Sequence, residues 1–415
     1  MNAPFASQSI ATADVTAVTT VPRVRTPTHL PSLDGLRAIS IAFVLLGHLS
    51  GTAHFGTVQL GMGDIAHLGV VVFFVISGFL ITTLLMAEES DQGGISLKLF
   101  YLRRALRILP ASYAFLAVIV VLRFIGIIEV PGRDLLFSFT YTVNFHAHRV
   151  WEVGHLWSLS VEEQFYLLWP FAFVALGGKR AIWVAASVMV VGPAARLGAW
   201  AFLHGTPYAD LEMFPMVADS LAAGCLLAGL RNWLEARRWY LELFRPMYSL
   251  LVLSVILMIN RLMGFTVAAV LGASLINVGI AVLVHRSVYR ASDRIGRALN
   301  FRPVAFVGTL SYSLYLWQQL FLNRHSNAWV NAFPQNLVFV IVVALASYLL
   351  LERPLLRIRR RLTAVRHESA DSTARVSVPP AFARQVGVPY ETNRIYTGSN
   401  AYDESLGGTR RLDPC

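Results

Sequence analysis

Long apolar runs recur along most of this 415-residue chain. A helix that crosses a bilayer needs roughly 20 mostly apolar residues, and about ten segments come close to that length. They lie near residues 36–55, 67–87, 110–128, 156–176, 180–202, 214–230, 247–262, 265–285, 303–322 and 335–353. Charged residues make up only 14% of the chain, against about 25% in soluble domains. We therefore expect an all-α, polytopic membrane protein.

Basic residues concentrate in alternate loops between these runs. The net charge of +11 could by itself suggest nucleic acid, but Lys and Arg separate apolar runs here, as orientation signals do. Loops after even-numbered runs hold the basic stretches 98–107, 231–245 and 286–302, whereas the other loops hold few basic residues. We therefore expect cytoplasmic termini, a multi-pass protein of the cell inner (plasma) membrane, the lipid bilayer as a partner, and no nucleic-acid partner.

The two ends of the chain lack long apolar runs. Residues 1–30 show no signal-peptide pattern and predict a disordered cytoplasmic arm. Residues 362–415 predict a disordered cytoplasmic tail, which leaves 31–361 as the transmembrane domain. The two cysteines, Cys225 and Cys415, suggest neither a disulfide framework nor a metal site, and we expect no metal.

Arg37 and His48 lie eleven residues apart in the first apolar run. Eleven helical steps return to within roughly 20° of the starting face and rise by about 16 Å, so the two side chains share one face. Ionisable groups in membrane helices are costly and commonly mark a site. The pair predicts an anionic ligand at the membrane edge and proton chemistry near mid-bilayer. The alternative for His48 is a neutral imidazole that hydrogen-bonds across helices.

An arginine-rich stretch, residues 100–110, precedes the third apolar run. Arg104 and Arg107 are three residues apart, so on a helix they are neighbours on one face. Two guanidinium groups on one face suit a polyphosphate. We expect Pro110 to open the next helix. The alternative is a cytoplasmic anchor that contacts lipid headgroups.

Two carboxylates lie near the start of the fourth run. Glu162 shares a helical face with Ser158 and Tyr166, whereas Glu163 points about 100° away. The alternative is an interfacial aromatic belt with two solvated carboxylates.

Small and polar residues also interrupt other runs. Ser77 and Gly78 would admit a neighbouring helix or a slender ligand close to the backbone. Tyr315 and Gln318, in the ninth run, are placed to face a polar cavity.

Six segments, in this order, resemble the acyltransferase type 3 family of integral-membrane acyltransferases. They are residues 33–48, 69–82, 100–110, 155–170, 310–319 and 352–354. The resemblance implies transfer of an acyl group, usually acetyl, from cytoplasmic acyl-CoA to a hydroxyl. That hydroxyl is commonly on a sugar of an envelope polysaccharide, an exopolysaccharide or a glycolipid. Acetyl-CoA is thus the expected donor, and a carbohydrate or glycolipid the expected acceptor.

The resemblance also implies roles for individual residues. Donor binding is expected of Arg37, Arg104 and Arg107. Catalysis is expected of His48 and Glu162. Apart from the resemblance, we expect substrate contacts from polar and aromatic residues of the fourth and ninth runs, namely Trp157, Ser158, Tyr166, Tyr315 and Gln318. Relatives often carry His where this chain has Gln318, so the sequence offers no second histidine at that position.

The mechanism expected from this resemblance is direct transfer. Neutral His48 removes the proton of the acceptor hydroxyl as its oxygen attacks the thioester, and Glu162 orients the imidazole or stabilises the imidazolium. An acyl-serine on Ser77 or Ser158 is an alternative route.

Two rival functions predict sequence features that differ from these. A proton-coupled transporter with a buried relay would predict helices broken in matching halves of the chain, and the sequence lacks that symmetry. An enzyme with a lipid-linked sugar donor would predict acidic loops, and these loops are basic.

Overall fold

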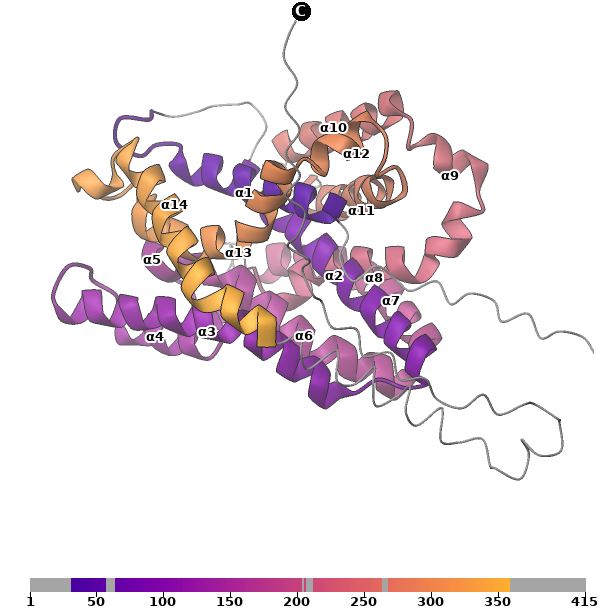
Figure 1. Ribbon diagram of the computed structural model, residues 1–415, viewed down its shortest axis with the longest axis horizontal. Helices are drawn as coiled ribbons and strands as arrows, with labels where there is room; N and C mark the ends of the chain where they lie inside the picture. Colours follow the sequence, from indigo (N-terminus) through magenta and orange to yellow (C-terminus); the bar gives the residue numbers. More distant parts are fainter. Residues whose placement is uncertain (1–30, 57–63, 204, 207–211, 263–267, 359–415) are drawn as a thin grey trace, which may run out of the picture. The chain divides into compact units, whose positions relative to one another are not determined.

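The computed structural model describes residues 31–56, 64–203, 205–206, 212–262 and 268–358 (Figure 1). The predicted arm, residues 1–30, and the predicted tail, residues 362–415, lie outside these ranges. Every regular element within the described ranges is helical.

A long helix overlaps each of the predicted apolar runs. They are α1 (Pro31–Leu49), α2 (Ile65–Gln92), α3 (Leu97–Phe124), α6 (Leu156–Leu176), α7 (Gly178–Leu203), α8 (Phe214–Glu235), α10 (Pro246–Arg261), α11 (Ala273–Tyr289), α13 (Arg302–Phe321) and α14 (Gln335–Ser347). Short elements join or extend them: α4 (Gly132–Phe139), η1 (Val143–Phe145), α5 (Trp151–Gly154), α9 (Arg238–Glu242), η2 (Ala268–Gly272), α12 (Arg294–Leu299), η3 (Trp329–Asn331) and η4 (Tyr348–Glu352).

Seven helices in the described part of the chain are long and apolar enough, by length and composition, to cross a membrane. α10 has only 16 residues. α6 and α13 have 21 and 20 residues, but their polar side chains lower their hydropathy. The all-α, polytopic membrane fold is confirmed. The number of about ten spans and the cytoplasmic termini stay predictions.

The first helix is shorter than the run predicted for it. α1 ends at Leu49, and Gly51 then adopts a left-handed backbone with φ of 85°, a conformation that glycine reaches without steric cost. His48 therefore lies in the last turn of α1, whereas the sequence predicts a position near the middle of a span.

The arginine-rich stretch lies inside a helix and not in a loop. Ser96 caps α3 because its side chain accepts a hydrogen bond from the amide of Leu99, so the helix begins well before the apolar run. Pro110 lies inside α3 and does not open it. Arg104 and Arg107 are thus held on a continuous helix.

Two glycines let α2 and α8 approach closely. A Cβ added to Gly78 would come within 2.0 Å of the Leu221 carbonyl oxygen, and one added to Gly224 within 2.1 Å of the Val75 oxygen. The two backbones are therefore in contact, as in membrane helix pairs with small interfacial residues. The helix-packing interpretation of Gly78 is confirmed.

α1 and α13 pack against each other in parallel. Near their beginnings, a Cβ on Gly308 would lie 1.8 Å from the Asp34 carbonyl oxygen. Near their ends, His48 contacts Gln318. Arg37 therefore lies near the beginning of this helix pair, and His48 lies near its end.

Candidate active site

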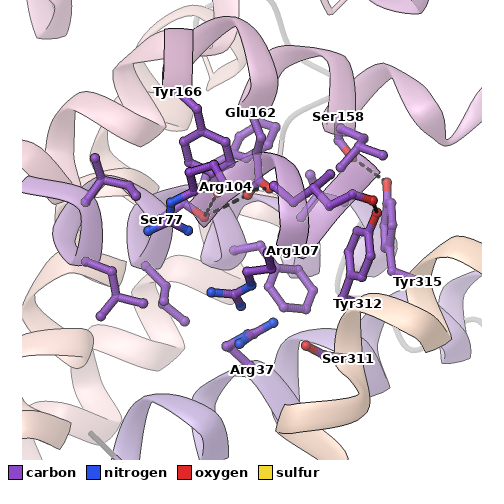
Figure 2. Close-up of a pocket in the computed structure, with 18 residues that line it drawn as sticks. Arg37, Ser77, Arg104, Arg107, Ser158, Glu162, Tyr166, Ser311, Tyr312 and Tyr315 are labelled. Atoms are coloured by element: carbon purple, nitrogen blue, oxygen red, sulfur yellow. Dashed lines mark hydrogen bonds between the residues drawn. The ribbon is translucent and has the colours of Figure 1, made fainter. Parts of the chain in front are cut away.

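A cavity opens between α1, α2, α3, α6 and α13 (Figure 2). Its empty space is about 790 Å³, counting the part open to solvent. Its polar lining consists of Arg37, Ser77, Arg104, Arg107, Ser158, Glu162, Tyr166, Ser311, Tyr312 and Tyr315. The apolar residues of the second run, with Ile108 and Leu159, complete the wall.

Three arginines from two helices line this cavity (Figure 2). The guanidinium of Arg104 lies over the rings of Tyr166 (5.1 Å) and Phe100 (5.6 Å). Arg37 Nη1 lies 3.8 Å from Asp34 Oδ1. The neighbouring Arg103 is not in the lining and pairs with Glu88 at 2.9 Å. The helical face predicted for Arg104 and Arg107 is the face that meets Arg37, and their role in donor binding stays a prediction.

Glu162 is the carboxylate that faces the cavity. Ser77 Oγ donates to Glu162 Oε1 at 2.8 Å. The Tyr166 hydroxyl lies 3.1 Å from Ser77 Oγ and 3.3 Å from Glu162 Oε2. Glu163 lies outside the lining, and its buried Oε1 has no hydrogen-bond partner in the described ranges. The predicted phasing of the two carboxylates therefore matches the structure.

Tyrosine and serine hydroxyls from α6 and α13 form another part of the cavity wall. Ser158 Oγ lies 2.6 Å from Tyr315 Oη, and Tyr315 donates to the carbonyl of His155 at 2.9 Å. Tyr312 donates to the carbonyl of Ile108 at 2.8 Å. Ser311 Oγ is buried, has no hydrogen-bond partner within the described part of the chain, and faces the same space, so it can contact a ligand there.

His48 lies outside this cavity lining. Its Nδ1 is 2.7 Å from Gln318 Oε1, and its ring meets Trp151 edge-on with 5.5 Å between centroids. The partner of the imidazole is thus Gln318, whereas the carboxylate of Glu162 is engaged by Ser77 and Tyr166. The structure therefore differs from the expectation that Glu162 orients His48.

The cavity and His48 are nonetheless close along α13. Tyr315, which lines the cavity, precedes Gln318 by three residues. Three residues of helix correspond to a rise of roughly 4.5 Å. A thioester carried to the Tyr315 end of the cavity would therefore need to pass about one further helical turn to reach His48.

Residues from two connecting segments surround the end of α1. Arg324 lies over the ring of Trp151 at 5.1 Å and donates to the carbonyl of Gly47 at 3.0 Å. His325 meets the same ring at 5.4 Å. Arg324 and His325 are exposed, so His48 lies just beneath a polar surface.

The cavity lining differs at a few positions from the residues that the sequence singles out. Trp157 lies outside the lining, stacks on His67 (5.9 Å between centroids) and meets Phe74 edge-on. Sequence reasoning missed Ser311 and Tyr312. A signal was present, because Ser311 and Tyr315 are four residues apart and share a helical face.

The remaining candidate nucleophiles are one cysteine and two serines, and they have different surroundings. Cys225 is buried, its thiol donates to the Gly78 carbonyl at 3.7 Å, and it lies outside the lining. Ser77 and Ser158 do line the cavity, so the acyl-serine alternative stays open. Within the described ranges, no three His, Cys, Asp or Glu side chains are grouped to hold a metal ion.

Comparison with known proteins gives a consistent match. A family model described as an acyltransferase domain matches residues 30–352. Peptidoglycan O-acetyltransferase OatA of Listeria monocytogenes is 29% identical over 320 residues, which is 70% of this chain and 49% of OatA. Putative O-acetyltransferase SACOL0978 of Staphylococcus aureus is 28% identical over 361 residues, 79% of this chain and 57% of that protein. The chain thus spans about half the length of these curated relatives. No solved structure matches the chain.

Proposed function

Because the chain belongs to the acyltransferase 3 family, we propose that it is a membrane enzyme that moves an acyl group, in the simplest case acetyl, from acyl-CoA to a hydroxyl of an envelope carbohydrate or glycolipid. The observation that carries this proposal is the cavity with three guanidinium groups against one carboxylate. Such a charge balance suits a ligand with several phosphates.

The arginines hold the donor. Arg104 and Arg107 project from α3 and Arg37 from α1 into the same space (Figure 2). Guanidinium forks bind phosphate oxygens with two hydrogen bonds each, so the diphosphate of CoA fits here. The acylated pantetheine arm then extends along the apolar wall toward Tyr315.

His48 carries out the proton transfer. Its Nε2 removes the proton of the acceptor hydroxyl while the hydroxyl oxygen attacks the thioester carbonyl carbon. The carbon–sulfur bond then breaks, and His48 returns the proton to the leaving thiolate. Glu162 acts at the donor end, where its hydrogen bonds with Ser77 and Tyr166 keep the carboxylate beside the arginines.

The acceptor reaches His48 from the end of α1 that is farther from the three arginines. His48 is in the last turn of that helix, beneath the exposed Arg324 and His325. OatA of Listeria monocytogenes is named as a peptidoglycan O-acetyltransferase, and this supports an envelope glycan as the acceptor class.

The transporter alternative accounts for a half-buried His and Glu within the helices, but it gives no reason for three arginines around one cavity. Binding of acetyl-CoA distinguishes the two functions. We expect purified protein to bind acetyl-CoA in competition with CoA, and the envelope glycans of cells that lack the protein to lose an acetyl-sized mass. A protein that binds no acyl-CoA would overturn the proposal.

A further inference from the structure

We propose that Gln318 is the residue that prepares His48 for catalysis: it fixes which imidazole nitrogen acts as the base and offers its amide N–H to the reacting carbonyl oxygen. This inference rests on the proposed function. Gln318 is fully buried, with an exposed fraction of 0%, and its Oε1 is 2.7 Å from His48 Nδ1. It lies one helical turn beyond Tyr315, the residue of α13 that lines the donor cavity.

The first part of the argument concerns the tautomer of His48. A neutral imidazole has one N–H and one free lone pair, and the hydrogen bond to one nitrogen decides which is which. When Gln318 Oε1 accepts a hydrogen bond from the Nδ1–H of His48, Nε2 keeps its lone pair and is the nitrogen that can act as the base. Triad enzymes use a carboxylate for this orientation. In this chain the amide performs it without adding a charge beside the imidazole.

The second part concerns the other end of the same amide. Gln318 Nε2 is buried and has no hydrogen-bond partner among the described residues. Buried donors are almost always paired, so an unpaired one beside a histidine suggests that a ligand completes the site. The carbonyl oxygen of a thioester gains negative charge when a hydroxyl attacks it, and a fixed N–H beside it stabilises that charge.

The surroundings also restrict the position of the His48 imidazole. His48 is also fixed by the ring of Trp151, and Arg324 closes the end of α1 by donating to Gly47. The imidazole is therefore held on two sides. The neighbouring Gln319 has a different task, because its Oε1 accepts from the amide of His155 and lies 2.9 Å from the His155 ring nitrogen. Gln319 ties α13 to the start of α6 and provides a matched comparison.

The test measures acetyl transfer from acetyl-CoA to an envelope fraction prepared from cells that lack the protein. Gln318→Leu removes both hydrogen-bonding functions, and Gln318→Glu keeps an acceptor for Nδ1 but has no N–H. Loss of one oxyanion donor typically costs about 10²–10³-fold in kcat, so we expect both variants to fall by about that factor with nearly unchanged acetyl-CoA affinity. Gln319→Leu should lower thermal stability while keeping the kcat of the folded fraction near wild type.

A pH profile separates a positioning role from a structural one. A carboxylate beside Nδ1 stabilises the imidazolium, so Gln318→Glu should move the low-pH limit of the rate to higher pH, which a packing defect would not do. Folded Gln318→Leu with a wild-type kcat, or a Gln318→Glu profile identical to wild type, would overturn the inference. Two other results would overturn the proposed function itself, and with it this inference: a wild-type protein that binds no acetyl-CoA, or a His48→Ala variant that transfers normally.

Discussion

Arg37 and His48 lie on one helix, but they have different surroundings and, in our account, different tasks. Arg37 faces a cavity shared with two further arginines. His48, about 16 Å further along the helix axis, contacts an amide and an indole. Separation of charge recognition from proton transfer lets the donor be held without placing the three donor-binding arginines against the base, where their charge would disfavour protonation of the imidazole.

His48→Ala tests the histidine at this scale. Loss of a positioned base typically costs about 10²–10⁴-fold in rate, so we expect transfer to fall by that factor while acetyl-CoA affinity stays near wild type. His54→Asn is the control, because His54 is exposed in the turn after α1 and has a φ of 65°, which Asn tolerates. Normal transfer by a well-expressed His48→Ala variant would remove this residue from the mechanism.

Glu162 and Glu163 form an internal comparison one helical step apart. Glu162→Gln keeps the size of the side chain but weakens its hydrogen bonds with Ser77 and Tyr166, so activity should fall strongly. Glu163→Gln should be mild, because that carboxylate lies outside the cavity lining. Transfer assays on membranes with matched protein levels decide between them. A silent Glu162→Gln beside a damaging Glu163→Gln would contradict our choice of carboxylate.

At the scale of elements, α3 presents adjacent arginines to different environments. Arg104→Ala combined with Arg107→Ala should lower acetyl-CoA affinity by an order of magnitude or more, because hydrogen bonds to charged groups contribute about 1.5–3 kcal/mol each. Arg103→Ala serves as the control, since Arg103 pairs with Glu88 outside the cavity. Equal effects of the two changes on donor affinity would favour the headgroup-anchor interpretation of the whole stretch.

The contact between α2 and α8 positions Ser77 and can be tested separately from the chemistry. Gly78→Ala would place a Cβ 2.0 Å from the Leu221 carbonyl oxygen, and overpacking of this kind typically costs about 1–3 kcal/mol. We expect a lower midpoint of thermal unfolding and lower membrane abundance. Gly94→Ala, with nothing within 4 Å of the added atom, should be neutral. If Gly78→Ala is as stable as wild type, the two helices are not held at this distance.

At the scale of the whole molecule, the sequence was informative about periodic features. The length of the apolar runs predicts the approximate positions of the long helices. The 3.6-residue period predicts that Glu162 and not Glu163 faces the cavity, and that Arg104 and Arg107 share a helical face. These depend on local sequence, so they could be predicted.

Contacts between distant segments could not be predicted in this way. Gln318 and His48 are 270 positions apart, and nothing in either segment specifies that they meet. The sequence also predicts too late a start for α3, because the cap at Ser96 lies in polar sequence before the apolar run. Trp157 stacks on His67 outside the cavity lining, a placement that its sequence position does not specify, and its contact with substrate stays a prediction.

The central claim is that this chain transfers an acyl group from acyl-CoA to an envelope carbohydrate, with His48 as the base. The most direct test incubates the purified full-length protein with acetyl-CoA labelled in the acetyl group and an envelope fraction from cells that lack it. We predict that label enters the carbohydrate fraction as an alkali-labile ester with the wild type and not with His48→Ala. Label that stays in acetyl-CoA with the wild type, or that transfers equally with His48→Ala, would contradict the account.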